Sequence, residues 1–239
     1  MTTEIEGRTE EIELAGNVGF WALVTLMIVL LVHPPGTTDL YDDGHQFLDH
    51  VDGLWIGIHF AAAVLFLVLL LPIGAWARNL SNRRARLLGR WAVHVSVAGT
   101  AVGLIHLTAT DTTTFVAFAE TFEAGEGSDV VALGADLLLR IHAATFVAWV
   151  TSYFFALPAV LAWAAWADGR YPVWHIWLSV VASILAGVSV VLTLIHGQLT
   201  TLSEMGIFRP SVSIFLIWLL VTTWWMRRGS VVGRSRTGA

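Results

Sequence analysis

The sequence predicts an all-α membrane protein, a bundle of six transmembrane helices forming one domain over residues 1–239. Three observations predict this class. Hydrophobic residues make up 56% of the chain and charged residues only 13%, about half the charge of an average soluble domain. Six apolar runs recur, each long enough to cross the core of a bilayer. The arginines gather on one side of these runs, as they do in proteins that obey the positive-inside rule.

The six predicted spans cover about residues 16–32, 54–77, 87–108, 137–166, 173–195 and 211–226. Most arginines lie before the first span, between spans two and three, between spans four and five, or after span six. These are Arg8, Arg78, Arg83, Arg84, Arg86, Arg90, Arg170, Arg227, Arg228, Arg234 and Arg236, which is 11 of 13. Only Arg140 and Arg209 fall on the other side. The bias predicts that both termini are cytoplasmic, in a multi-pass protein of the inner (plasma) membrane.

The composition excludes several classes of function. The chain has no cysteine, which excludes disulfides, thiolate metal sites and covalent c-type haem. It also has no lysine, so a retinal Schiff base cannot form. No charged residue lies in the middle third of any predicted span, which disfavours an ion-coupled transporter or a proton pump. The net charge of −5 gives no reason to expect a nucleic-acid partner.

The loops and span ends carry further signals. Phe115, Phe118 and Phe122 recur at helical spacing, so we expect an amphipathic helix over about residues 112–124 on the outer surface, against lipid or a partner protein. Nine tryptophans near span ends are expected to anchor the helices at the interface. They are Trp55, Trp76, Trp91, Trp163, Trp166, Trp174, Trp177, Trp224 and Trp225. His94 and His175 near the Arg-rich ends of their spans are interpreted as interfacial too.

A short internal repeat connects spans two and three with spans four and five. Ile58-His59, Pro72 and Trp76 are matched by Ile141-His142, Pro158 and Trp163. Leu104-Ile105-His106 is matched by Leu194-Ile195-His196. The pattern favours a duplicated two-helix hairpin, although so short a match in an apolar sequence also arises by coincidence.

The repeat brings four histidines to a similar depth near the outer ends of the spans. His59, His106, His142 and His196 come from four different helices, and imidazole is the most frequent metal ligand in proteins. We therefore predict a site that holds a transition metal (Cu, Fe or Zn) or haem b through these four histidines. Asp52 is expected to support the site, and His33 is a further candidate ligand. Such a site requires spans two to five to be neighbours with all four imidazoles facing inward.

Each histidine also has a simpler interpretation. A histidine at the end of a membrane helix can hydrogen-bond a carbonyl or water without binding any ligand. Whether the chain is an enzyme is therefore left open, and a redox role would follow from a metal or haem. The first alternative is an accessory subunit that docks to other membrane-protein subunits through its outer loops. The second is a pocket for a lipid or an apolar small molecule.

The chain resembles two groups of membrane proteins. Leu31-Val32-His33-Pro34, the acidic loop after it, and the helix with Trp55 and His59 resemble the layout of uncharacterised six-span integral membrane proteins of GC-rich bacteria, which implies no activity. The inward histidines near one face also resemble the geometry of haem A synthase-type membrane cytochromes. The chain lacks the acidic and His-Arg signature of that family, so the likeness extends to geometry alone.

Overall fold

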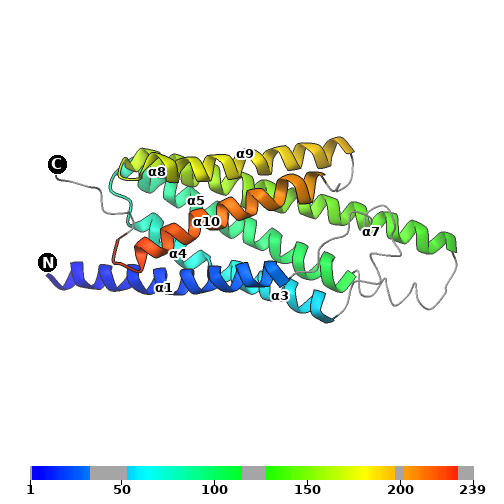
Figure 1. Cartoon of the computed structure of the whole chain (residues 1–239), viewed down its shortest axis with the longest axis horizontal. Coiled ribbons are helices and arrows are strands. Elements are labelled where there is room, and N and C mark those ends of the chain that lie inside the picture. The colour runs from blue at the N-terminus through cyan, green and yellow to red at the C-terminus, as the bar shows by residue number, and fades with distance from the viewer. Residues whose placement is uncertain (1, 33–52, 115–127, 197–201, 231–239) are drawn as a thin grey trace.

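The computed structural model describes residues 2–32, 53–114, 128–196 and 202–230, and this part of the chain consists of helices without any strand. The helices lie side by side along the long axis of the molecule (Figure 1). The α-helices are α1 (Thr2–Val32), α3 (Gly53–Val68), α4 (Leu70–Arg78), α5 (Arg83–Leu104), α7 (Ser128–Trp149), α8 (Leu157–Asp168), α9 (Val173–His196) and α10 (Arg209–Met226). Three segments have the wider π-helical turn, namely η1 (Ile105–Thr114), η2 (Val150–Ala156) and η3 (Leu202–Phe208).

The six predicted spans are confirmed as helices long and apolar enough to cross a membrane. They cover Thr9–Val32, Ile56–Arg78, Arg83–Ala109, Arg140–Asp168, Val173–His196 and Gly206–Met226. The predicted outer-surface helix over 112–124 lies mostly outside the described residues. Its first three positions, 112–114, continue the helical segment η1.

The spans are arranged as a ring in the order of the chain. Span one packs against span two (α3 and α4), α4 against α5, α5 against α8, α8 against α9, and α9 against α10. The ring closes because α10 also packs against α1. A site made from all four histidines would require spans two to five to be mutual neighbours, but α9 packs mainly against α8, η2, η3 and α10 rather than against span two.

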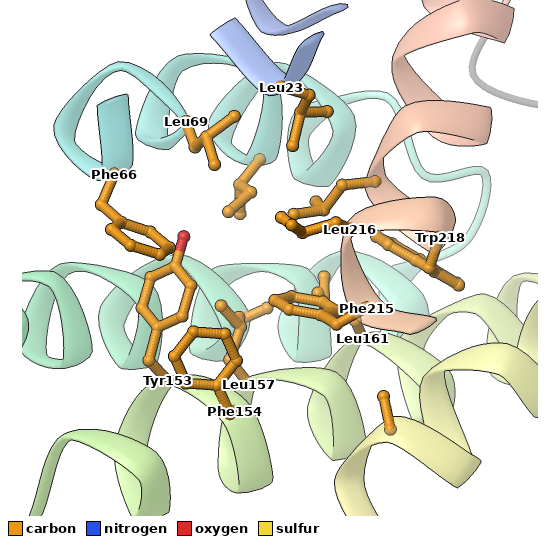
Figure 2. Packing of buried hydrophobic residues seen from close by; sticks show 14 of the residues in the cluster. Leu23, Phe66, Leu69, Tyr153, Phe154, Leu157, Leu161, Phe215, Leu216 and Trp218 are labelled. Atoms are coloured by element: carbon orange, nitrogen blue, oxygen red, sulfur yellow. The ribbon is translucent and has the colours of Figure 1, made fainter. Parts of the chain in front are cut away.

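Large side chains fill the centre of this ring (Figure 2). The residues labelled there come from spans one, two, four and six: Leu23, Phe66, Leu69, Tyr153, Phe154, Leu157, Leu161, Phe215, Leu216 and Trp218. The rings of Tyr153 and Phe154 meet Phe215 edge-on at 6.2 and 6.3 Å between centroids. Because lipid is as apolar as leucine, this packing and not water exclusion holds the helices together.

Glycine permits a close contact between the backbones of α1 and the end of α10. A Cβ atom at Gly16 would lie 2.4 Å from the backbone nitrogen of Arg227 and 2.6 Å from the carbonyl carbon of Met226. One turn later, a Cβ at Gly19 would meet Pro72 of α4 and Thr223 of α10. α1 therefore fits into the groove between α4 and α10 only because these positions have no side chain.

Span four changes its helical period around η2. Its buried positions come in adjacent pairs four residues apart: Trp149 and Val150, Tyr153 and Phe154, then Leu157 and Pro158. A spacing of four exceeds the 3.6 residues per turn of an α-helix, and the wider turn of η2 keeps these pairs facing the core. π-Helical turns of this kind are frequent at functional sites.

Serines of α9 and α10 satisfy carbonyl groups on neighbouring helices. Ser183 donates to the carbonyl of Phe155 at 2.8 Å, and Ser179 donates to that of Pro158 at 2.8 Å. Ser211 of α10 donates to the carbonyl of Ala182 at 2.7 Å. These three bonds connect spans four, five and six where no water is present to compete.

Replacing Ser183 with alanine should lower the free energy of unfolding by about 0.6 kcal/mol, the average for a polar contact between membrane helices. The matched control is Ser152→Ala, because Ser152 donates only within its own helix, to Ala148 and Trp149. Unfolding in mixed detergent micelles measures both variants. Equal losses in the two would contradict the assignment of an interhelical bond.

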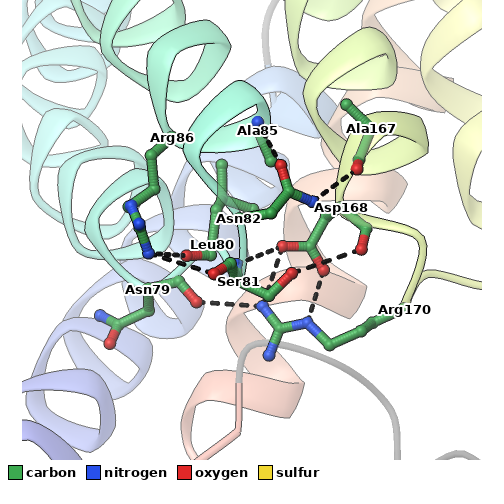
Figure 3. Close-up of polar contacts among 9 residues, drawn as sticks. All are labelled: Asn79, Leu80, Ser81, Asn82, Ala85, Arg86, Ala167, Asp168 and Arg170. Carbon is green, nitrogen blue, oxygen red and sulfur yellow. Dashed lines mark hydrogen bonds and ion pairs between the residues drawn. The ribbon is translucent and has the colours of Figure 1, made fainter.

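A polar network at the Arg-rich end joins the turn between α4 and α5 to the turn between α8 and α9 (Figure 3). The carboxylate of Asp168 accepts from the backbone N–H of Ser81 and from two nitrogens of Arg170. Arg170 also donates to the carbonyl of Asn79 at 3.0 Å, and Asn82 donates to that of Ala167 at 2.7 Å. Its hydrogen bond to Asp168 raises the pKa of Arg170, so the guanidinium keeps its charge.

Two predictions about interfacial residues are wrong. Trp76 is buried, with its ring 5.8 Å from Trp218 and 5.9 Å from Tyr171. His175 is fully buried as well; it stacks on Trp218 at 4.7 Å and its Nε2 lies 3.0 Å from Oγ1 of Thr222. Both side chains face the interior because they lie on the inward stripes of their helices. Six of the nine tryptophans are exposed as expected: Trp91, Trp163, Trp166, Trp174, Trp177 and Trp224.

Candidate functional site

Three of the four predicted histidines are buried at the end of the bundle opposite the arginine network. His59 lies in α3, His106 in η1 and His142 in α7, with exposed fractions of 6%, 3% and 7%. η1 packs against both α3 and α7, so the three histidines come from adjoining helices. His196 is exposed, at the last residue of α9. The predicted supporting residues His33 and Asp52 lie outside the described part of the chain.

His106 and His142 are in contact with each other. Their ring centroids are 4.8 Å apart, with the ring planes tilted by 38°. This distance is at the short end of the range for aromatic rings in direct contact. Two imidazoles from two different helices therefore contact each other in a tilted arrangement inside the protein.

Thr145 connects the two histidines. Its hydroxyl donates to the backbone carbonyl of His142, one turn earlier in α7, at 3.0 Å. The Thr145 oxygen lies 3.0 Å from Nδ1 of His106. Since the hydroxyl hydrogen is used toward His142, the hydrogen-bond network assigns the proton to Nδ1 of His106. This tautomer leaves the lone pair of the neutral imidazole on Nε2, the atom that can bind a metal or accept a proton.

Aromatic side chains border the pair on its inner side. The ring of Trp149 lies 5.2 Å from that of His106, and the ring of Phe146 lies 5.9 Å away. Trp149 fits there because Gly103 has no side chain; a Cβ at that position would lie 2.3 Å from Nε1 of Trp149. The histidine pair is thus closed off from the bundle centre by apolar rings.

The predicted set of four metal ligands is not brought together by the described residues. His106 and His142 are in contact, and His59 is buried on the neighbouring helix. His196 is exposed at the end of α9, where Leu194 and Ile195 are exposed too. In the part of the chain that the structure describes, no group of three or more His, Asp or Glu side chains has the arrangement to hold a metal ion.

Sequence reasoning missed the residues that position the histidines. Thr145 and Trp149 follow His142 at i+3 and i+7, and Gly103 precedes His106 by three residues. These spacings place them on the same helix faces as the two histidines. Helical periodicity around each histidine was therefore a signal that could have found them.

A separate apolar groove lies between α8 and α9, with a volume of about 490 Å³. It is lined by Ala159, Ala162, Trp163, Trp166, Ile176, Val180, Ser183 and Ile184. None of these is a histidine, and the hydroxyl of Ser183 is already bonded to Phe155. The groove is thus distinct from the histidine pair and offers mainly apolar contacts.

Comparison with models of protein families, with curated proteins and with solved structures finds no match for this chain.

Proposed function

We propose that this chain is an integral membrane protein that binds a transition metal ion through His106 and His142. The contact between their two buried rings, oriented by Thr145, carries the proposal. Metal-binding histidines typically donate their second ring N–H to an acceptor that fixes the ring, and Thr145 fills this role for His106. Imidazole ligands suit Zn, Cu or Fe, and a bound Cu or Fe would supply redox chemistry.

The geometry favours a small ion over haem b. A haem held between two histidines separates their rings by the whole thickness of the macrocycle. The rings of His106 and His142 are in direct contact at 4.8 Å, which leaves no room for a porphyrin between them. A single ion needs only Nε2 of His106 and one ring nitrogen of His142 to lie about 2.0–2.1 Å from one point.

The orientation in the membrane is part of the proposal. The arginine bias supports an Arg-rich end in the cytoplasm and a histidine pair near the outer face of the plasma membrane. Cysteines introduced at Ser81 and Gly125 should then react with an impermeant reagent from opposite sides of the membrane. Labelling of both from the same side would contradict this topology.

We also infer that spans two–three and four–five are duplicated hairpins. In both, the regular α-helix is interrupted shortly before a proline, at Leu69 before Pro72 and at η2 before Pro158. The turns of the two hairpins meet in the Asp168 network (Figure 3).

Metal analysis of purified protein tests the binding site. After loading with Zn²⁺, Cu²⁺ or Fe²⁺ and removal of excess ion, wild-type protein should retain one equivalent of at least one of them. His106→Ala and His142→Ala should each reduce the retained metal to background. His94→Ala is the matched control, because His94 is exposed in the middle of α5, 12 residues before His106. Equal retention in all three variants would contradict the proposal.

Thr145→Val should weaken metal binding by about 10- to 100-fold, the usual effect of removing a group that orients a ligand. Valine keeps the shape of threonine but cannot accept the hydrogen bond from His106. Titration with a competing chelator measures the affinity. Thr108→Val provides the comparison, because the Thr108 hydroxyl donates within its own helix to Leu104. Unchanged affinity in Thr145→Val would show that Thr145 does not position His106.

A further inference from the structure

The exposed face of α5 combines a cationic end with an apolar length. Arg83, Arg84, Arg86 and Arg90 are all exposed in its first two turns. On the same side of the helix follow Leu87, Trp91 and Val97, which are 57%, 59% and 50% exposed. At about 1.5 Å per residue the four arginines span about 10 Å along the helix, enough to cross the headgroup layer of one leaflet, which is about 5–8 Å thick.

These arginines lack the partners that other cations of this end have. Arg78 pairs with Glu11, Arg170 with Asp168, and Arg227 bonds Asn17 and lies 4.4 Å above the ring of Phe20. Among the described residues, no ion pair reaches Arg83, Arg84 or Arg90. Arg86 donates only to the neutral carbonyls of Leu80 and Ser81. No Asp or Glu occurs anywhere between Arg78 and Ala109.

The position of the four arginines makes the excess of positive charge at this end of α5 less favourable. They occupy the N-terminal turns of α5, where the helix dipole is positive and favours anions. Asn82 caps the helix by accepting from the N–H of Ala85 at 2.9 Å, but it brings no charge. Four cations therefore repel one another and the helix end, and an external anion would relieve this repulsion.

We propose that the N-terminal half of α5 binds an anionic phospholipid. The phosphate contacts Arg83, Arg84 and Arg90, and an acyl chain lies along Leu87, Trp91 and Val97. The cationic and apolar surfaces are continuous on one face of the helix. This favours a lipid over a soluble anion, because a soluble anion would not contact the apolar residues. Cationic side chains near a membrane surface contribute about 1 kcal/mol each toward anionic lipid, which corresponds to about fivefold in affinity per arginine.

Native mass spectrometry with added phosphatidylglycerol or phosphatidylcholine tests this proposal on the full chain. Wild-type protein should retain phosphatidylglycerol at least about tenfold more strongly. The triple variant R83Q/R84Q/R90Q should lose this preference, while R83K/R84K/R90K, which keeps the charge and the membrane topology, should retain most of it. If the triple glutamine variant does not fold, R90Q alone should weaken phosphatidylglycerol binding by about fivefold.

Two outcomes would overturn the proposal. The first is equal retention of phosphatidylglycerol by the wild-type and glutamine proteins. The second is displacement of the lipid by excess inorganic phosphate, which would indicate a site for a soluble anion without a role for Leu87 and Trp91. Leu87→Ser should weaken lipid retention if the acyl chain lies on this face, and unchanged retention would also count against the proposal.

Discussion

Gly16→Ala should lower the free energy of unfolding by about 3 kcal/mol, the upper part of the usual range for overpacking. The added Cβ would lie 2.4 Å from the backbone nitrogen of Arg227 and 2.7 Å from the Cβ of Met226. Backbone atoms cannot rotate away, so α1 must move from α10. This contact closes the ring of six spans, and its loss also separates α1 from the Arg-rich end of α10.

Gly57→Ala is the matched control for this substitution. Gly57 lies in α3, and nothing lies within 4 Å of a Cβ built there. Alanine is favoured over glycine inside a helix by about 0.5–1 kcal/mol, so this variant should be as stable as the wild type or slightly more stable. Thermal unfolding in detergent compares the two. Similar melting temperatures for Gly16→Ala and Gly57→Ala would contradict the close approach of α1 and α10.

Asp168→Ala should cost about 2–3 kcal/mol of stability. Breaking a buried ion pair typically costs about 3–5 kcal/mol. The Asp168 side chain is fully buried, but that of Arg170 is 41% exposed, so water takes over part of the lost interaction. The substitution also leaves the N–H of Ser81 without its acceptor and frees the two hairpin turns from each other.

Two further variants separate charge from hydrogen bonding at this network. Asp168→Asn keeps an oxygen for the N–H of Ser81 and should lose only part of the stability. Glu11→Gln breaks the ion pair with Arg78, which is exposed on both sides, and should have an effect close to zero. The unfolding midpoint in a denaturing detergent orders the three variants. An effect of Asp168→Ala no larger than that of Glu11→Gln would contradict the role of Asp168.

The six spans could be predicted from the sequence because long apolar runs have few other uses. Their arrangement could not. The order of neighbours depends on close contacts such as Gly16 against Arg227 and Ser211 against Ala182. Small residues of this kind occur throughout apolar helices, so their presence does not reveal which helix they face.

The burial of His59, His106 and His142 agrees with the inward orientation that the repeated Ile-His pattern suggested. His196 repeats the pattern but not the environment, since it ends a helix whose last residues Leu194 and Ile195 are exposed. The Ile-His motif therefore predicted that these histidines lie at helix ends, but it did not predict whether their side chains face the interior or the exterior of the bundle. The burial of His175 could have been predicted from the sequence. It lies on the same stripe of α9 as Ser179 and Ser183, where small residues mark the side that packs against other helices.

X-ray absorption at the edge of the bound metal is the most direct measurement on the histidine pair. In metal-loaded wild-type protein, the spectrum should show imidazole scattering from two nitrogen ligands about 2.0–2.1 Å from the metal. In His106→Ala, one of the two imidazoles should be missing from the spectrum of any residual metal. A first shell made only of oxygen, or a spectrum identical in wild type, His106→Ala and His142→Ala, would show that these residues do not bind the metal.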